Sequence, residues 1–148
     1  MPSDAFQRHS LTLHSSRAAS SEASAWARAL AEAAGLPEEH AYALDLCIVE
    51  IMSNVFDHSY RGAPGEIRVG LDLGGAGAIV TISDHGPAFD PLSVPAPVVA
   101  ASIDEASVGG MGIHMVRATA TGCRYERRDG RNVFTAWFGE NKWGQTPI

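Results

Sequence analysis

The spacing of apolar residues along the chain predicts three helices and five strands. Period-two alternation from His9 to Ser15 predicts a short edge strand. A serine-rich start at 20–21 caps a helix that runs to Gly35, and Pro37 opens a second helix that ends near His58. Within the second helix, apolar residues spaced four, three and four apart predict one buried stripe, made of Leu44, Ile48, Ile51 and Val55.

The second half of the chain predicts two β-hairpins, separated by a long loop and a third helix. The hairpins join residues 66–73 to 78–83 and 124–128 to 133–138. Residues 87–108 contain four prolines and predict a long loop that is either functional or disordered, and residues 112–120 predict the helix. The elements together predict an α+β fold, a two-layer sandwich with a mixed, mainly antiparallel sheet and helices on one face. We expect one domain over residues 1–148, with a core of about 9–138 and a tail at 139–148.

Composition and charge narrow the class of function. A net charge of −6 argues against a nucleic-acid partner, and the one basic cluster, at 124–131, is interrupted by Glu126 and Asp129. We interpret that cluster as a solvated strand and turn. No apolar run is long enough to span a membrane, and the N-terminus lacks a signal-peptide pattern, so a cytoplasmic location is expected. Cys47 and Cys123 have neither disulfide-framework nor metal-site spacing.

The first candidate motif lies on the second predicted helix. Glu50, Asn54 and His58 are spaced four apart and therefore share one face, roughly opposite the buried stripe. Asn54 offers a hard oxygen to Mg²⁺, and Glu50 can take a proton from an attacking hydroxyl or water. The alternative for this motif alone is a polar, solvent-facing stripe.

The second and third motifs are a turn after a strand and a glycine cluster before a helix. In the turn 84–91, the Asp84 carboxylate can accept the exocyclic amine of adenine, and Gly86 lets the backbone approach a flat ring. The alternative is a Gly-Pro turn with a capping aspartate. The cluster 109–112 can present free N–H groups to phosphate, but it matches neither a dinucleotide fold nor a Walker loop.

The order of these three motifs resembles the N, G1 and G2 boxes of the GHKL (histidine kinase-like) ATPases. Within that superfamily the chain is similar to the anti-sigma factor serine/threonine kinases of the RsbW and SpoIIAB type. The segment from Tyr125 to Asn132 also looks like that branch. The resemblance covers roughly residues 9–138 and implies the Bergerat ATP-binding fold.

The resemblance implies a role for each motif residue, with ATP and Mg²⁺ as cofactors. Glu50 is the catalytic base, Asn54 is the Mg²⁺ ligand, and Asp84 binds adenine with Gly86 packed beside it. His58 either supports the phosphate end or is a structural histidine. Residues 87–108 form the ATP lid. The further nucleotide-binding residues are Phe89, Gly109, Gly110, Met111, Gly112 and Ile113.

The chain departs from the family pattern in three places. Ala88 stands where many relatives have a second glycine, which implies a stiffer adenine loop. Thr121 and Gly122 replace an acidic pair, which puts a partner contact there in doubt. The lid from 92 to 108 has no Lys or Arg, so neutralisation of the γ-phosphate would depend on Mg²⁺ and backbone N–H groups.

The leading functional hypothesis is a protein serine/threonine kinase in a partner-switching circuit. It would phosphorylate a STAS-type anti-anti-sigma protein and alternately bind a sigma factor or similar target, and the resemblance implies a homodimer. A nucleotide-dependent partner-binding module with little or no catalysis is the alternative. The ATPase end of a histidine kinase is disfavoured, since no dimerisation helices with a phospho-acceptor histidine precede the domain. A domain that binds no nucleotide would require three coincident motifs in order.

Overall fold

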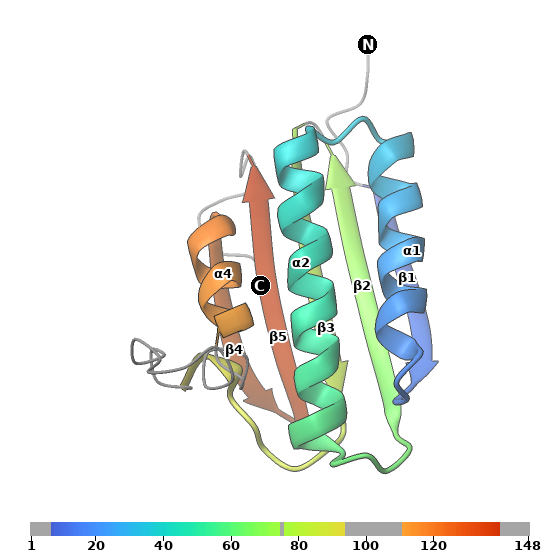
Figure 1. Ribbon diagram of the computed structural model, residues 1–148, viewed down its shortest axis with the longest axis vertical. Helices are drawn as coiled ribbons and strands as arrows, with labels where there is room; N and C mark the ends of the chain where they lie inside the picture. Colours follow the sequence, from blue (N-terminus) through green and yellow to red (C-terminus); the bar gives the residue numbers. More distant parts are fainter. Residues whose placement is uncertain (1–6, 75, 94–110, 140–148) are drawn as a thin grey trace, which may run out of the picture.

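The computed structural model describes residues 7–74, 76–93 and 111–139. Five strands and three α-helices are joined by a π turn and a short 3₁₀ turn (Figure 1). In chain order the elements are β1 Gln7–His14, α1 Ala19–Ala33, α2 Glu38–Asn54, the π turn Val55–Ser59, β2 Glu66–Gly74, β3 Gly77–Asp84, the 3₁₀ turn Pro91–Ser93, α4 Met111–Thr119, β4 Gly122–Arg128 and β5 Arg131–Gly139.

The strands form one five-stranded sheet in the order β1-β2-β3-β5-β4. All four described pairings are antiparallel, so the sheet shows no parallel pair among the described residues. The three helices lie on the same face of the sheet, with α2 between α1 and α4 (Figure 1). The predicted α+β two-layer sandwich is therefore confirmed, and β1 is the predicted edge strand.

The hydrophobic core lies between this helical layer and the sheet. The predicted stripe of α2 is buried, as are alternate residues of β2 and β3, which is the pattern of strands with one covered face. On α1 the buried residues are alanines at every fourth position: Ala19, Ala23, Ala27 and Ala31. Such small side chains let a helix axis approach its neighbours closely, which explains how α1 packs against α2.

The helix ends differ from the sequence predictions in two respects. Helix α1 starts at Ala19 with Ala18 as its N-cap, and no side chain caps it, so the predicted serine cap is wrong. Helix α2 ends at Asn54, and residues 55–59 form a π turn in place of a last α turn. Gly35 ends α1 in the left-handed region, at φ 71°, as predicted. Among the described residues, no helix combines the length and apolarity needed to cross a membrane.

Candidate functional site

The π turn separates His58 from Glu50 and Asn54, the other two polar residues that the sequence places in one row. Its wider hydrogen bonds, such as Tyr60 N–H to the Val55 carbonyl at 2.9 Å, add a residue to the turn and rotate later side chains about the helix axis. Asn54 lines a small cavity together with Ile51 of the buried stripe. His58 lines a different, open groove. The predicted common face is therefore wrong for His58, while Glu50 and Asn54 remain four apart within α2.

Glu50 lies against the first turn of α4. A Cβ atom added to Gly112 would be 1.8 Å from Glu50 Oε2, so the carboxylate occupies the space that only a glycine leaves free. Partial burial raises the pKa of Glu50 above its ordinary value near 4.5. A carboxylate with a raised pKa, beside a helix N-terminus that can bind an anion, is suited to accept a proton from a nucleophile attacking a phosphate.

Asp84 is the last residue of β3 and its side chain is buried, with 2% of the residue exposed. Its Oδ1 atom accepts hydrogen bonds from the Gly86 N–H, at 2.8 Å, and from Asn132 Nδ2, at 3.0 Å. These two bonds use both lone pairs of Oδ1. Among the described residues Oδ2 has no hydrogen-bond partner, and Asp84 lines the small cavity with Asn54.

Gly86 is packed tightly for a reason internal to the protein. A Cβ atom at this position would lie 2.9 Å from both the Cβ and the carbonyl oxygen of Ser59, and 3.0 Å from Asp84 Oδ1. Ser59 ends the π turn and is itself buried. Packing against Ser59 and Asp84 is therefore enough to require glycine in the turn after β3, whether or not a ligand approaches it from the cavity.

Asn132 and Arg127 belong to the site but were missed as site residues in the sequence. Asn132, the second residue of β5, is 4% exposed and pairs directly with Asp84 in the sheet. Arg127 is exposed, as predicted for its cluster, but its Nη1 atom also donates a 2.7 Å hydrogen bond to the Gly86 carbonyl. Both contacts cross more than 40 positions of sequence, and only the β3–β5 and β4–β5 register could have revealed them.

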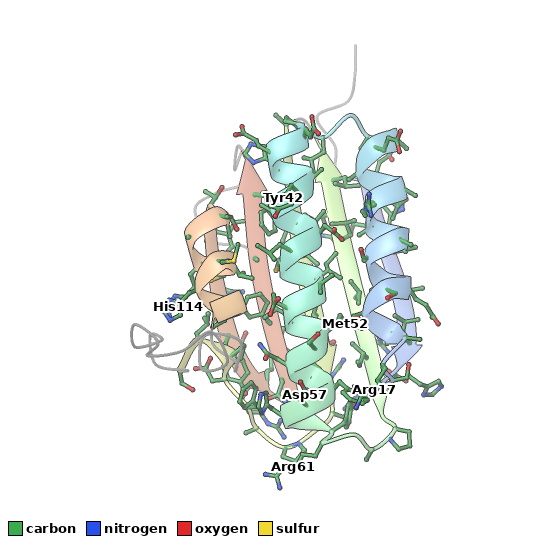
Figure 2. The ribbon with its side chains drawn as sticks, in the orientation of Figure 1. Arg17, Tyr42, Met52, Asp57, Arg61 and His114 are labelled. Atoms are coloured by element: carbon green, nitrogen blue, oxygen red, sulfur yellow. The ribbon has the colours of Figure 1, made fainter. Side chains whose placement is uncertain are left out.

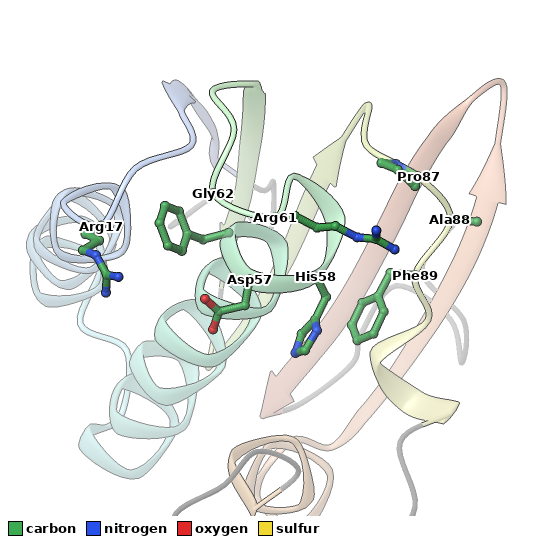
Figure 3. A pocket seen from close by; sticks show the side chains of 9 residues that line it. Arg17, Asp57, His58, Arg61, Gly62, Pro87, Ala88 and Phe89 are labelled. Atoms are coloured by element: carbon green, nitrogen blue, oxygen red, sulfur yellow. The ribbon is translucent and has the colours of Figure 1, made fainter.

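Phe89 lines the small cavity and stacks on His58. The two ring centroids are 4.6 Å apart, with an interplanar angle of 16° (Figure 3). Both rings line an open groove of about 570 Å³, which also includes Arg17 before α1, Asp57 of the π turn and Arg61 after it (Figures 2 and 3). This groove includes the predicted site residues His58 and Phe89 but not Glu50 or Asp84.

The small cavity has suitable chemistry for a purine but too little room in this conformation. Its walls are apolar, and Asp84, Asn54 and Asn132 supply polar atoms. Its volume of about 20 Å³ suffices for roughly one water molecule, whereas ligand pockets span about 300–1,000 Å³. Most of its lining residues belong to α2, β3 and β5, and Phe89 and Pro91 line it from the segment that follows β3.

The third motif lies only partly within the described residues. Gly109, Gly110 and positions 94–108 of the predicted lid lie outside them. Met111 begins α4, and Gly112 contacts Glu50. The side chain of Ile113 is buried in the core, so any contact from this residue to a nucleotide would have to come from its backbone.

A metal site made of protein side chains alone is absent from the described residues. No group of three or more His, Cys, Asp or Glu side chains is close enough to hold an ion there. Mg²⁺ in phosphoryl-transfer sites is usually held by one or two protein oxygens together with substrate phosphates. The oxygen donors of Asn54 and Glu50 fit that mode of binding.

Comparisons with known proteins agree with the motifs. The family profile described as "Histidine kinase-like ATPase domain" matches residues 13–138. Serine/threonine-protein kinase BtrW of Bordetella bronchiseptica is 34% identical over 95 residues, which cover 64% of this chain and 67% of that protein. The crystal structure of the RsbU and RsbW domains of a Mycobacterium tuberculosis protein superposes with a TM-score of 0.62 at 17% identity. That match covers 89% of this chain but only 32% of the solved one. The resemblance inferred from the motifs is thus confirmed.

Proposed function

The chain belongs to the histidine kinase-like ATPase domain family, and from that membership we propose that it is an ATP-dependent serine/threonine protein kinase. The observation that supports catalysis best is the Glu50 carboxylate, whose pKa is raised by burial, against the first turn of α4. The similarity to a Bordetella protein named as a serine/threonine-protein kinase supports the same reaction.

In this proposal the purine enters the cavity beside Asp84. The free Oδ2 atom accepts the exocyclic amine of adenine, and the apolar walls from α2, β3 and β5 contact the ring. Asn54 holds Mg²⁺, which when bound neutralises charge on the phosphates. The glycine-rich start of α4, which includes Gly112, borders the phosphates through backbone N–H groups.

Glu50 then acts on the substrate hydroxyl. The serine oxygen forms a bond to the γ-phosphorus while the bond from that phosphorus to the bridging oxygen breaks, and ADP leaves. The proton of the serine hydroxyl passes to Glu50. The raised pKa of Glu50 favours this transfer, because a base is most effective when its pKa lies near the working pH.

The protein substrate in this proposal is a STAS-type anti-anti-sigma protein in a cytoplasmic partner-switching circuit, with a sigma factor or similar target as the alternative partner. The fold similarity to a structure containing an RsbW domain motivates this choice. A homodimer belongs to the same proposal.

A phosphotransfer assay tests the proposal. The purified protein is incubated with γ-labelled ATP, Mg²⁺ and candidate STAS-domain proteins from its source, and label on serine is measured. We expect transfer by the wild type and by Glu39→Gln, a matched control at the exposed start of α2. Glu50→Gln should slow it at least about 100-fold and leave a measurable residual rate. Equal transfer by Glu50→Gln and wild type would rule out the assigned base.

A nucleotide-dependent binding module is the second candidate, and the position of Phe89 favours it. Phe89 lines both the small cavity and the open groove, so a nucleotide bound beside Asp84 would contact a residue that also shapes the groove surface. Such a contact could control partner binding without turnover. Calorimetry that shows ATP-dependent partner binding, in the absence of labelled product, would support this module over the kinase.

A further inference from the structure

Asn132 is a buried polar side chain near the start of β5. It contacts Asp84, which is proposed to bind adenine, and the closing segment, by which we mean Pro87 to Phe89 beside the cavity. Its Nδ2 atom donates to Asp84 Oδ1 at 3.0 Å and to the Pro87 carbonyl at 2.9 Å. Its Oδ1 atom accepts from the Phe89 N–H at 3.0 Å and from the Tyr125 hydroxyl at 2.5 Å.

These contacts determine both the orientation and the residue type at position 132. The Phe89 N–H can only donate and the Pro87 carbonyl can only accept, so the amide cannot be flipped. A carboxamide has two donor hydrogens and two acceptor lone pairs, and all four are used in these bonds. Aspartate has the same shape but would have no N–H to give to Asp84 and Pro87.

The bond from Asn132 leaves Asp84 with one available oxygen. Adenine presents a single exocyclic amine donor beside a ring acceptor, whereas guanine presents two adjacent donors, N1–H and N2–H₂. A carboxylate with both oxygens free pairs well with two adjacent donors, because each oxygen can accept one bond. When Oδ1 is saturated by Gly86 N–H and Asn132 Nδ2, Asp84 can offer only Oδ2.

We infer that Asn132 is a positioning residue that sets the preference for adenine over guanine, by holding one Asp84 oxygen away from the base. The inference rests on the proposed nucleotide site. The same side chain holds Pro87 and Phe89, so it fixes the carboxylate and the closing segment in one arrangement.

The test measures equilibrium dissociation constants for ATP and GTP, with Mg²⁺, in the wild type, Asn132→Ala and Asn132→Asp. One more hydrogen bond from a base to the charged Asp84 carboxylate changes binding by about tenfold or more. We therefore expect the preference for ATP over GTP to fall at least tenfold in Asn132→Ala. In Asn132→Asp, a second carboxylate beside Asp84 should weaken ATP binding further.

Thr135→Val is the matched control, because Thr135 is also a buried polar residue of β5 but does not line the cavity. It should change thermal stability and leave the ATP to GTP ratio at the wild-type value. A purely structural role for Asn132 would weaken both nucleotides in parallel, and an unchanged ratio in the folded variants would overturn the inference. Failure of both variants to fold would also overturn it, since the side chain would then serve folding. If the wild type binds no nucleotide, the proposed function itself fails.

Discussion

Replacing Gly112 with alanine should disable the proposed base without unfolding the protein. The new Cβ would lie 1.8 Å from Glu50 Oε2 and 2.1 Å from its Cδ. An ordinary contact begins at 3.4 Å, so the carboxylate must move by about 1.6 Å. Because Glu50 is half-buried at the end of a flexible side chain, it can swing outward toward solvent.

The size of the effect follows from that displacement. A misplacement of about 1 Å at a reacting group can cost roughly 10²-fold in rate. We therefore expect the phosphotransfer rate at saturating ATP to fall at least about 100-fold in Gly112→Ala. Stability should hold or rise slightly, since alanine is more favourable than glycine within a helix by about 0.5–1 kcal/mol.

Single-turnover transfer of labelled phosphate to the protein substrate measures this effect, with thermal unfolding measured in parallel. Gly70→Ala is the control, because its Cβ would meet nothing closer than 3.9 Å and it should retain the wild-type rate. If Glu50 is the base, the double variant Gly112→Ala with Glu50→Gln should be no slower than Glu50→Gln alone. A Gly112→Ala protein that transfers phosphate at the wild-type rate would refute the assignment of Glu50.

Four further predictions concern the same region and the core. Gly86→Ala should destabilise the fold by about 1–3 kcal/mol in denaturant unfolding, because its Cβ would lie 2.9 Å from Ser59; unchanged stability would contradict that close packing. Since burial raises the pKa of Glu50, the acidic limb of the rate–pH profile should lie above pH 4.5 and be lost in Glu50→Gln. Because the pKa of Glu50 is higher in the folded protein than in the unfolded chain, its contribution to stability is present at low pH. That contribution is lost as the pH rises through the pKa of the folded protein. Glu50→Gln should therefore unfold no more easily than wild type at neutral pH. Burial raises the pKa of both thiols, so a thiol reagent should modify half-buried Cys123 before Cys47, which should react only in denaturant; mass spectrometry of the labelled peptides checks the order.

The parts of the fold that the sequence predicts are those determined by local periodicity. The stripe of α2 and the alternation of β2 and β3 each repeat within a few residues, so the buried face can be inferred from the sequence alone. The hairpin between β4 and β5 is also predictable from local sequence, because an Asp-Gly pair is typical of a tight turn. Asp129 and Gly130 both adopt the positive φ of such a turn.

The site was harder to predict because its contacts depend on tertiary packing. Residues spaced four apart share a helix face only while the helix stays α, and no residue between Asn54 and Ser59 signals the π turn that moves His58 into the groove. Asn132 carries no motif of its own. It reaches Asp84 because β3 pairs with β5, and this pairing places the two residues opposite each other although they are 48 positions apart in the sequence.

Two glycines from the predicted motifs, Gly86 and Gly112, are required for different structural reasons. Gly86 was predicted to let a ring approach, yet it is already required by Ser59, so its presence would persist in a protein that had lost nucleotide binding. Gly112 leaves room only for the Glu50 carboxylate, which has no evident packing role at that position. A domain that used nucleotide solely to change shape would not need that space. The contact between Glu50 and Gly112 is therefore the feature that favours phosphotransfer over binding alone.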